Sequence, residues 1–468
     1  MTTAVKVSVI GAGSATFSLG LVKDLCLTES LAGSLVSFMD IDEARLDMIT
    51  KLASRYAQEL GADLQFESTT DRRVSMQNAD FVINTAAVRS HDHQVAMRGV
   101  IAKHGYYHRM GHRVPGSFYN FQLMLDVARD MEQICPEAWL IQSGNPVFDG
   151  CTLMTRETGV KICGLCHGHY GVLEIAHTIG LDLSDMNDLT WQAPGLNHNI
   201  WLTHFFYRGE DAYPLIDEWI ETKGEEYWRT HVAKRTHDIQ MSQGAVHQYR
   251  LYGAFPIGDT VRRGGWWYHT DLPTKKHWFG EPWGGPDTDV GRPVHVKELE
   301  TRIAQMTALA NDAQASLVEA LGSTKTHEQQ VPIIDALTND NEGQFQVNVP
   351  NNGSLTGIPD DVVVELPAVI NKKGIQTLNV GDMPRKVMLE HILPEWLEME
   401  RGLEAFQTGD LSMLLWGALN VHQTGSYDQA VAVLDDLLAM DGHEGMKEFF
   451  QYPPHTQILT EKHNVSDQ

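Results

Sequence analysis

Short apolar runs recur through the first third of the chain, and segments of helical length separate them. The runs are VKVSVIG (5–11), SLVSFMD (34–40), ADFVINTAA (79–87), EAWLIQSGNP (137–146) and VKICGLC (160–166). Such runs are typical of strands buried on both faces, and their alternation with helices predicts a parallel, doubly wound, Rossmann-like α/β sheet. Because ligands of such sheets bind beyond the carboxyl ends of the strands, we expect functional residues directly after these runs.

The pattern changes at about Gly195, where continuous apolar runs give way to a mixed texture. The predicted elements are a Trp- and turn-rich segment over 259–287, a long helix over 294–321, short strands at 345–350 and 361–367, and two amphipathic helices at the end. We therefore predict two domains. A Rossmann-like domain would span 1–194, and a mixed α+β domain would span 195–468.

The first apolar run leads into the turn G-A-G-S-A-T, which matches the first two glycines of the dinucleotide-binding motif G-x-G-x-x-G but lacks the third. Gly11 permits the tight turn, and Gly13 lets a pyrophosphate approach the helix that starts after Ser14. Asp40 ends the second run, where a carboxylate accepts both ribose hydroxyls and repels a 2′-phosphate, which favours NAD over NADP. Asn84 lies near the end of the third run and is a further candidate for contact with the cofactor. The alternative is a glycine turn without a ligand.

Cys166 ends the last run, at a position where a helix should begin, so the helix field would favour its thiolate. His198 lies in a predicted turn, and a thiolate with an imidazole makes half of a catalytic metal site, with positions open for water and substrate. The alternative, which the residues alone favour, is a small buried thiol and a locally hydrogen-bonded imidazole. His167 and His169 are weaker candidates that would orient the helix start, and C-H-G-H lacks the second cysteine of a zinc-finger half-site.

Acidic residues outnumber basic ones, 61 against 36, and the formal net charge is −25. This balance argues against nucleic acid or an anionic membrane as a partner, because both require a basic face. The chain has no apolar run of bilayer length and no signal-peptide core, and its five cysteines lack the spacing of a disulfide framework. We therefore expect a cytoplasmic protein with reduced thiols that acts on a small molecule.

Blocks of sequence through nearly the whole chain resemble glycoside hydrolase family 4. The blocks are GAGSATFSLGLVKDL, MDIDEARL, ADFVINTA, GNPVFDG, GLCHGHYGV, GLNHNIWL, YGAFPIGDTVR, FGEPWGG, NVPNNG and DDVVVELPA. Their occurrence in order is a specific signal, although no single block would be. The resemblance implies a fold like that of lactate and malate dehydrogenases and a glycosidase that depends on NAD and a divalent metal, outside the usual two-carboxylate scheme.

The resemblance also implies a reaction that starts with oxidation of the sugar at C3 by NAD, while a cation, Mn²⁺ in the family, holds the C2 and C3 oxygens. The C2 proton becomes acidic beside the new ketone, a base removes it, and the leaving group departs from C1. Water then adds, and NADH restores C3. By motif, Cys166 and His198 would be the metal ligands, and Asn145 would bind sugar hydroxyls. Thiolate and imidazole suit zinc or iron, but sugar oxygens and water would complete a harder shell for manganese.

The same resemblance indicates Asp259, in PIGDT, as the base. A carboxylate of ordinary pKa is a weak base, so this role requires that the metal and the ketone have already acidified C2–H. Other branches of the family use a tyrosine, for which Tyr249 and Tyr252 are the fallback. Without the resemblance, a turn-capping role for Asp259 would be preferred.

The residues after the metal cysteine indicate the substrate branch. Family members that act on 6-phosphosugars carry Asp-Met-Pro or Asn-Val-Pro there, whereas this chain has His-Gly-His and resembles the branch acting on unphosphorylated α-glucosides, α-glucuronides or α-galacturonides. His167 and Arg262 are candidates for contact with the sugar, and a guanidinium near C6 can hold a uronate carboxylate or neutral hydroxyls. Arg109 and Arg113 lie in a Gly/His-rich loop that departs from the subgroup pattern.

Two other interpretations are left open. An NAD-dependent hydroxy-acid or sugar-acid dehydrogenase, which the fold alone would suggest, would accumulate NADH, whereas the glycosidase releases sugar without net change. A non-catalytic NAD-binding regulator would not respond to manganese and a reductant. The family further leads us to expect a homodimer or homotetramer.

Overall fold

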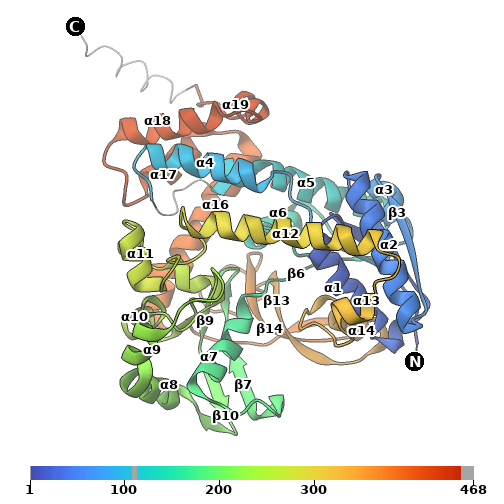
Figure 1. Ribbon diagram of the computed structural model, residues 1–468. Helices are drawn as coiled ribbons and strands as arrows, with labels where there is room; N and C mark the ends of the chain where they lie inside the picture. Colours follow the sequence, from blue (N-terminus) through green and yellow to red (C-terminus); the bar gives the residue numbers. More distant parts are fainter. Residues whose placement is uncertain (1, 108–112, 455–468) are drawn as a thin grey trace.

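The computed structural model describes residues 2–107 and 113–454, and its central element is a twelve-stranded mixed sheet (Figure 1). Six parallel strands form one half of the sheet in the order β3-β2-β1-β4-β5-β6, which is the doubly wound arrangement. They are β1 (Lys6–Ile10), β2 (Ser34–Met39), β3 (Leu64–Thr69), β4 (Phe81–Asn84), β5 (Trp139–Gln142) and β6 (Lys161–Gly164). The apolar runs predicted all of them except β3, whose alternating, partly exposed residues form no continuous run.

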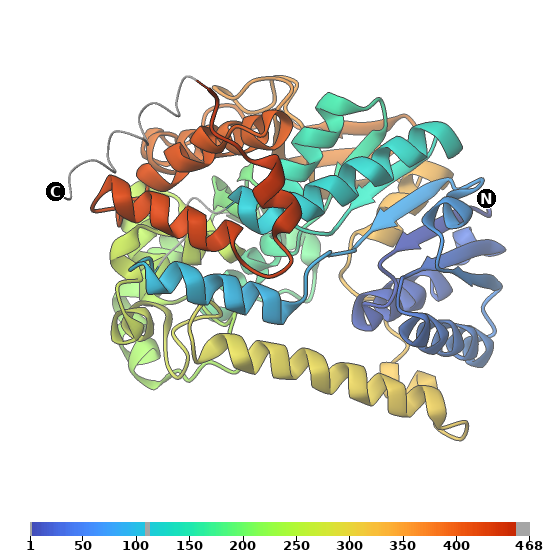
Figure 2. The ribbon, with the colours of Figure 1, turned by 90° about the horizontal axis from the view of Figure 1, so that it is seen from above.

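Helices cover both faces of this parallel half (Figures 1 and 2). They are α1 (Ala15–Cys26), α2 (Glu43–Leu60), α3 (Arg72–Met76), α4 (His91–Lys103), α5 (Arg113–Ile134) and α6 (Val147–Glu157). The next helix, α7 (Gly171–Ile179), belongs to a separate buried cluster of the later part of the chain. Apolar residues of α1 and α2 share one buried cluster with the sheet, and those of α5 and α6 share another. The predicted Rossmann-like α/β architecture is confirmed.

The other half of the sheet is antiparallel and begins where Asn348 pairs with Gly164 of β6. Its strands are β8 (Gly195–Leu196), β9 (Asn199–Leu202), β12 (Phe255–Ile257), β13 (Gly343–Pro350), β14 (Val363–Asn371) and β15 (Gly374–Thr377). A small second sheet contains β7 (Leu189–Gln192), β10 (His204–Tyr207) and β11 (Glu210–Asp211). Both predicted strands, at 345–350 and 361–367, are confirmed within β13 and β14.

Short helices fill the region between β11 and β13. They are α8 (Tyr213–Trp219), η4 (Ile220–Gly224), α9 (Glu225–Thr230), α10 (Gln243–Tyr252), η5 (Gly258–Arg263), η6 (Trp266–Tyr268), α11 (Leu272–Phe279), α12 (Gly291–Asn311), α13 (Leu317–Leu321) and α14 (Gln330–Asn339). The predicted single helix over 294–321 is wrong, because the chain breaks between α12 and α13. Ser316 caps α13, and the carboxylate of Glu59 on α2 accepts hydrogen bonds from the backbone N–H groups of Leu317 and Val318.

More helices close the chain than the two that were predicted. Among the described residues they are α15 (Arg385–Val387), η7 (Met388–Ile392), α16 (Leu393–Thr408), α17 (Leu411–Leu419), α18 (Tyr427–Leu438) and α19 (Glu444–Phe449). Gly409, with φ +74°, ends α16, and Asp410 and Ser426 cap the next two helices, which explains the breaks. α16 packs on α5, α18 packs on α4 and α12 packs on α2, so the later part of the chain covers helices of the earlier part. The division at residue 194 stays a prediction.

In the part of the chain that the structure describes, no helix is both long and apolar enough to cross a bilayer. The side chains of Arg109 and Arg113 lie outside the described residues.

Candidate active site

The turn between β1 and α1 has the features of an anion-binding site. Gly11 has a φ of +85°, and a Cβ there would lie 2.7 Å from the backbone of Ala86. Ser14 precedes α1 without capping it through its side chain. The first backbone N–H groups of a helix are donors to which a phosphate can bind.

The carboxylate of Asp40, which follows β2, lies against this turn. Its Oδ2 accepts a hydrogen bond of 2.7 Å from the backbone N–H of Gly13, and its Oδ1 accepts one of 2.9 Å from Asp42. A Cβ at Gly13 would lie only 2.6 Å from Oδ2. Asp40 therefore lies against the glycine turn, at the place where this fold recognises the ribose of a dinucleotide.

The two asparagines at the strand ends differ in exposure. Asn84 is fully buried, its Nδ2 donates to Oε1 of Gln142 at 3.0 Å, and its Oδ1 accepts from the backbone of Ala86 at 3.2 Å. Its polar groups are engaged inside the protein, where they hold the loop after β4 against β5. Asn145 follows β5 with an exposed side chain, and its carbonyl accepts a hydrogen bond of 3.3 Å from Asn120.

A close contact between glycines brings the loop after β6 against η5. A Cβ at Gly258, whose φ is +60°, would lie 2.4 Å from the carbonyl oxygen of Gly168. A Cβ at Gly171 would lie 2.2 Å from the side chain of Gln240, which itself accepts a 2.7 Å hydrogen bond from the backbone of Gly258. The glycines near Cys166 therefore allow two backbones to approach, which places the segment after Cys166 beside the segment that carries Asp259.

His198 stands in the turn between β8 and β9 with a left-handed φ of +63°. Its Nδ1 lies 3.6 Å from Oδ2 of Asp259, and its carbonyl accepts a hydrogen bond of 3.4 Å from Thr260. The same Thr260 hydroxyl accepts a hydrogen bond of 2.8 Å from the backbone of Ile200. These contacts join the His198 turn to η5, so the predicted imidazole and the predicted base are neighbours.

Arg262 binds the carboxylate of Asp259 from one side. Its Nε donates to Oδ1 at 2.9 Å and its Nη2 donates to Oδ2 at 2.7 Å, while its Nη1 pairs with Asp287. Asp287 also accepts a hydrogen bond of 2.8 Å from Arg98 of α4. Burial alone would raise the pKa of Asp259, but Arg262 and His198 hold it well below its usual range. Each of the three guanidinium nitrogens of Arg262 thus donates to a carboxylate, which leaves little of the group for contact with a sugar.

The surroundings of Cys166 raise the pKa of its thiol. Burial is the largest cause, and the carboxylates of Glu365 and Asp259 act in the same direction. A hydrogen bond from the backbone of Gly168 offsets only part of this, so the pKa of the thiol rises to about 12. This shift is opposite in direction to the predicted effect of the helix field, because the cost of burying the charge exceeds the stabilisation from the helix start. A cation at the sulfur would be needed to deprotonate it near neutral pH.

The two histidines that flank Gly168 have separate roles. His167 is 59 % exposed, and its Nδ1 lies 3.0 Å from Oε1 of Glu328, which raises the pKa of the imidazole through a hydrogen bond. His169 is buried against Trp191, and its Nδ1 donates to the carbonyl of Cys166 at 3.1 Å. Only one of the pair faces inward, and it orients the backbone of Cys166.

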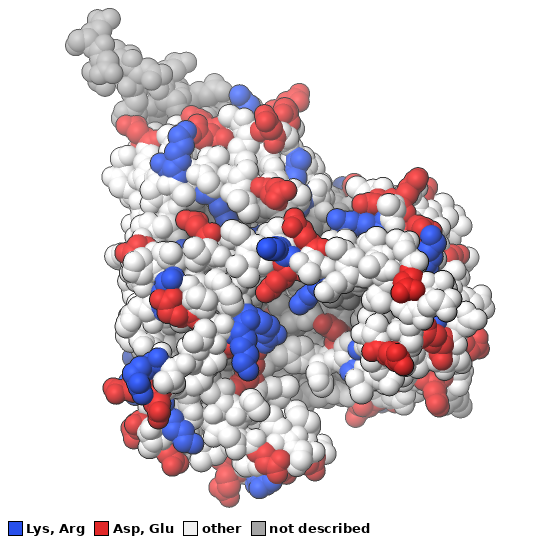
Figure 3. All heavy atoms as spheres, in the orientation of Figure 1, with Lys and Arg blue, Asp and Glu red and all other residues white. Residues whose placement is uncertain are grey.

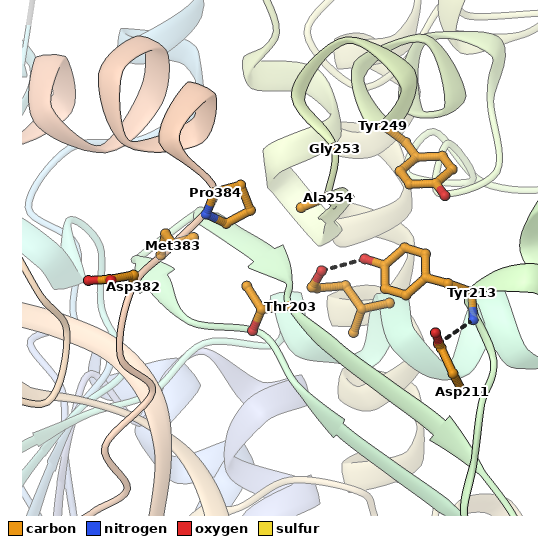
Figure 4. A pocket seen from close by; sticks show the side chains of 10 residues that line it. Thr203, Asp211, Tyr213, Tyr249, Gly253, Ala254, Asp382, Met383 and Pro384 are labelled. Carbon is orange, nitrogen blue, oxygen red and sulfur yellow. Dashed lines mark hydrogen bonds between the residues drawn. The ribbon is translucent and has the colours of Figure 1, made fainter.

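The fallback tyrosines lie elsewhere. Tyr249 lines a groove of about 510 Å³ together with Thr203, Tyr213 and Met383 (Figure 4). Its hydroxyl donates to Asp217 at 3.0 Å. Tyr252 is buried against Trp201 and His391. The residues that line the groove include none of the predicted metal ligands and not Asp259.

Models of one protein family match most of the chain. The family 4 glycosyl hydrolase model matches residues 6–181, and the model of the family's C-terminal domain matches residues 193–424. The chain belongs to family 4 of the glycosyl hydrolases.

Relatives of this family 4 glycosyl hydrolase are named for activities on phosphorylated and on unphosphorylated sugars. An alpha-galactosidase of Bacillus subtilis is 26 % identical over 402 residues, which are 82 % of this chain and 85 % of the relative. An alpha-glucosidase of Erwinia rhapontici is 26 % identical over 414 residues, 81 % of this chain and 86 % of the relative.

Solved structures confirm the fold of the family 4 protein. A 6-phospho-alpha-glucosidase from gut microorganisms, in complex with NAD and Mn²⁺, superposes with a TM-score of 0.75 at 18 % identity and covers 96 % of this chain and all of its own. The lactate dehydrogenase of Eimeria maxima superposes with a TM-score of 0.52 at 14 % identity over 88 % of this chain and 99 % of its own. The dehydrogenase-like fold is therefore confirmed.

The donors at the site suit a cation that keeps open positions. Among the described residues no three His, Cys, Asp or Glu side chains gather into a complete metal site. The thiol of Cys166 lies in the loop after β6 and the imidazole of His198 in the turn between β8 and β9, and nearby carboxylates give the site the negative field that a cation needs. Two protein donors exclude a four-ligand structural zinc site and fit a catalytic ion whose other positions are open.

Sequence reasoning missed three polar residues around the site. Glu365 lies buried in β14, Asn197 precedes His198, and Asp287 holds Arg262. A single carboxylate inside the apolar run VVVELP was a signal for Glu365, because strand interiors do not bury an acid without a partner. Nothing local distinguishes Asp287, whose role depends on the approach of α4.

Proposed function

We propose that this protein hydrolyses an unphosphorylated α-glycoside, an α-glucoside or an α-uronide, with NAD and a divalent cation such as Mn²⁺. The observation that carries the proposal is the approach of the His198 turn to Asp259, beside the loop of Cys166 at the carboxyl end of β6. NAD supplies reversible oxidation at C3, and the cation draws charge from the C2 and C3 oxygens. The residues of the chain bind and orient the sugar and remove its C2 proton.

The glycine turn after β1 supports the NAD part of the proposal. Gly11 and Gly13 leave room at the start of α1 for a pyrophosphate, and Asp40 lies beside them for the ribose. A carboxylate at this place disfavours a 2′-phosphate, which is why NAD and not NADP is proposed.

Asp259 is the proposed base for the C2 proton, with Cys166 and His198 as the cation's ligands and Asn145 and His167 as sugar contacts. The pair of hydrogen bonds from Arg262 keeps Asp259 ionised and oriented. Its low pKa makes it a weak base, so proton removal depends on prior acidification of C2–H. This order of events is what the oxidation at C3 provides.

The substrate branch rests on the His-Gly-His segment after Cys166 and on the alpha-glucosidase and alpha-galactosidase relatives. Structural neighbours named for 6-phosphosugars make the phosphorylated substrate the competing possibility. Arg262 does not decide it, because Asp259 and Asp287 both bind its guanidinium. A homodimer or homotetramer in a cytoplasmic setting completes the proposal.

A dehydrogenase is the second candidate, and one observation favours it. The imidazole of His198 lies 3.6 Å from the Asp259 carboxylate, as a histidine base with an orienting acid would. Against a dehydrogenase, the guanidinium of Arg262 is paired with two carboxylates and does not offer a clamp for a substrate carboxylate.

One screen tests the proposal. Nitrophenyl α-glucoside, α-galactoside, α-glucuronide and a 6-phosphoglucoside are offered with NAD, Mn²⁺ and thiol, and each additive is then left out in turn. We expect nitrophenol release from an unphosphorylated substrate only with all three additives and without build-up of NADH. Undiminished release without NAD or metal, or steady accumulation of NADH, would overturn it.

A further inference from the structure

A buried carboxylate lies under the proposed metal ligands. Glu365 is 1 % exposed in β14, where its Cα pairs with that of Gly195 in β8 and its neighbours Val364 and Leu366 are also buried. Its Oε2 accepts a hydrogen bond of 2.9 Å from Nδ2 of Asn197, and the side chains of Asn348 and Gln346 also hydrogen-bond to it. Burial nevertheless raises the pKa of this carboxyl group to about 7, and an apolar residue would suit the strand better, because burying an acid destabilises the fold.

Asn197 connects this carboxylate to both proposed ligands. Its side chain is 3 % exposed, and it forms a hydrogen bond with the Cys166 thiol that lowers the pKa of the thiol, although burial dominates that pKa. It also directly precedes His198, whose left-handed φ of +63° ties the imidazole to the conformation of this turn. Displacement of Asn197 would therefore move a hydrogen-bond partner of the sulfur and the turn that carries His198.

The carboxylate determines which way the amide points. An amide has two N–H groups on one side and an acceptor oxygen on the other. The 2.9 Å contact is made by Nδ2 of Asn197, so Oε2 of Glu365, when ionised, accepts from the N–H side of the amide. The second N–H of this amide is then available to the sulfur of Cys166. Partners of this kind, one step behind the ligands, typically change metal affinity by about 10–100-fold when removed.

We propose that Glu365 is a positioning residue that acts through Asn197 to hold Cys166 and His198 in the arrangement that binds a divalent cation. The inference rests on the proposed function, because it takes these two side chains as the ligands. It adds a role for the lone acid of β14.

Cation binding by the purified full-length protein tests the inference without any substrate. Mn²⁺ affinity is measured by titration calorimetry, and Co²⁺ gives a sulfur-to-metal absorption band that reports on the Cys166–metal bond. Glu365→Gln keeps the shape of the side chain but can offer N–H as well as oxygen to Asn197. We expect Mn²⁺ to bind about 10–100-fold more weakly and the Co²⁺ band to shift or lose intensity.

A double-mutant cycle separates positioning from general destabilisation. If Glu365 acts through Asn197, the losses in Mn²⁺ affinity of Glu365→Gln and Asn197→Ala are not additive in the double variant. Asp24→Asn is the matched control, because Asp24 is equally buried at 1 % exposure and accepts a 2.6 Å hydrogen bond from Thr326. We expect this control to bind Mn²⁺ as the parent protein does.

Cys166→Ser separates the inference from the proposed function. If Cys166→Ser still binds Mn²⁺ like the parent protein, the proposed metal site is wrong and the inference fails with it. If Cys166→Ser loses Mn²⁺ but Glu365→Gln and Asn197→Ala leave affinity and the Co²⁺ band unchanged, only the inference is overturned. Additive losses in the cycle would also overturn it.

Discussion

Arg262 binds Asp259 through two hydrogen bonds, 2.9 Å from Nε to Oδ1 and 2.7 Å from Nη2 to Oδ2. A fork of this kind gives strong geometric control over a carboxylate. It also keeps the carboxylate charged in a partly buried site. The arrangement suits a base that must be ionised and aligned before substrate binds. It also makes the carboxylate too weak a base to remove a proton that has not been acidified first.

Removal of the Arg262 charge should destabilise the protein. Asp259 and Asp287, which share this guanidinium, would then face each other without compensation. We expect Arg262→Gln to lower the free energy of unfolding by about 3 kcal/mol, measured by urea denaturation. Addition of Asp287→Asn should recover part of the loss, and a loss that is the same in both variants would contradict the account.

Asp259→Asn and Tyr249→Phe distinguish the two kinds of base. We expect Asp259→Asn to lower kcat by about 10²–10⁴-fold, because proton transfer by a positioned group typically contributes that much. Tyr249 lines the groove of Figure 4, away from Asp259, and its hydroxyl donates to Asp217. We therefore expect Tyr249→Phe, which removes only this hydrogen bond, to change kcat by less than about 2-fold. Steady-state kinetics on a nitrophenyl glycoside decides between them, and the opposite order of effects would show that the tyrosine is the base.

The glycine turn can be tested by NAD binding alone. In Gly13→Ala the new methyl would lie 2.6 Å from Oδ2 of Asp40 and displace the carboxylate or the turn. We expect the dissociation constant of NAD to rise by at least about 10-fold, or about 1.4 kcal/mol, in a fluorescence titration. Gly99→Ala is the control, because no atom lies within 4 Å of its would-be Cβ. Equal NAD affinity in both variants would argue against the turn as the cofactor site.

The parallel half of the sheet could be predicted because its strands are buried on both faces and therefore leave continuous apolar runs. β3 was not predicted because it lies at the edge of the sheet, where exposed and partly buried residues alternate and form no continuous apolar run. The break between α12 and α13 was missed for a different reason. It depends on the carboxylate of Glu59, which lies far away in sequence and caps α13.

Candidate site residues could be predicted where they directly follow a strand of the parallel sheet, as Gly13, Asp40 and Cys166 do. The charge state of Cys166 could not be predicted, because its pKa depends on burial and on carboxylates that approach from other elements. The engagement of Arg262 by Asp287 was hidden for the same reason. Contacts between distant segments leave no periodic pattern in the sequence.

The contact between α4 and the last helices should depend on pH. Nε2 of His93 lies 2.8 Å from Nε2 of His443, whose Nδ1 donates to the carbonyl of Leu437. His443 therefore accepts at Nε2 and His93 donates, so at most one ring can be protonated. Burial, together with Arg89, lowers the pKa of both imidazoles below the ordinary value of 6.5.

A lowered pKa means that the unfolded chain binds protons at a higher pH than the folded one. The stability from this contact is then complete above the ordinary histidine pKa and is lost as pH falls from there through the folded values. Urea denaturation at neutral and at mildly acidic pH should show a smaller loss in a His93→Gln, His443→Gln double variant than in the parent protein. His204→Gln, at an exposed position on β10, is the control. Parallel losses in all three proteins would rule out this contribution.

The central claim is that the C2–H bond breaks before the glycosidic bond does, and one measurement tests it directly. Hydrolysis is run in D₂O with NAD and Mn²⁺, and the released sugar is examined by NMR. We predict that one deuterium stands at C2, because the proton taken by the base exchanges with solvent before C2 is protonated again. A sugar that keeps its original hydrogen at C2 would contradict the account.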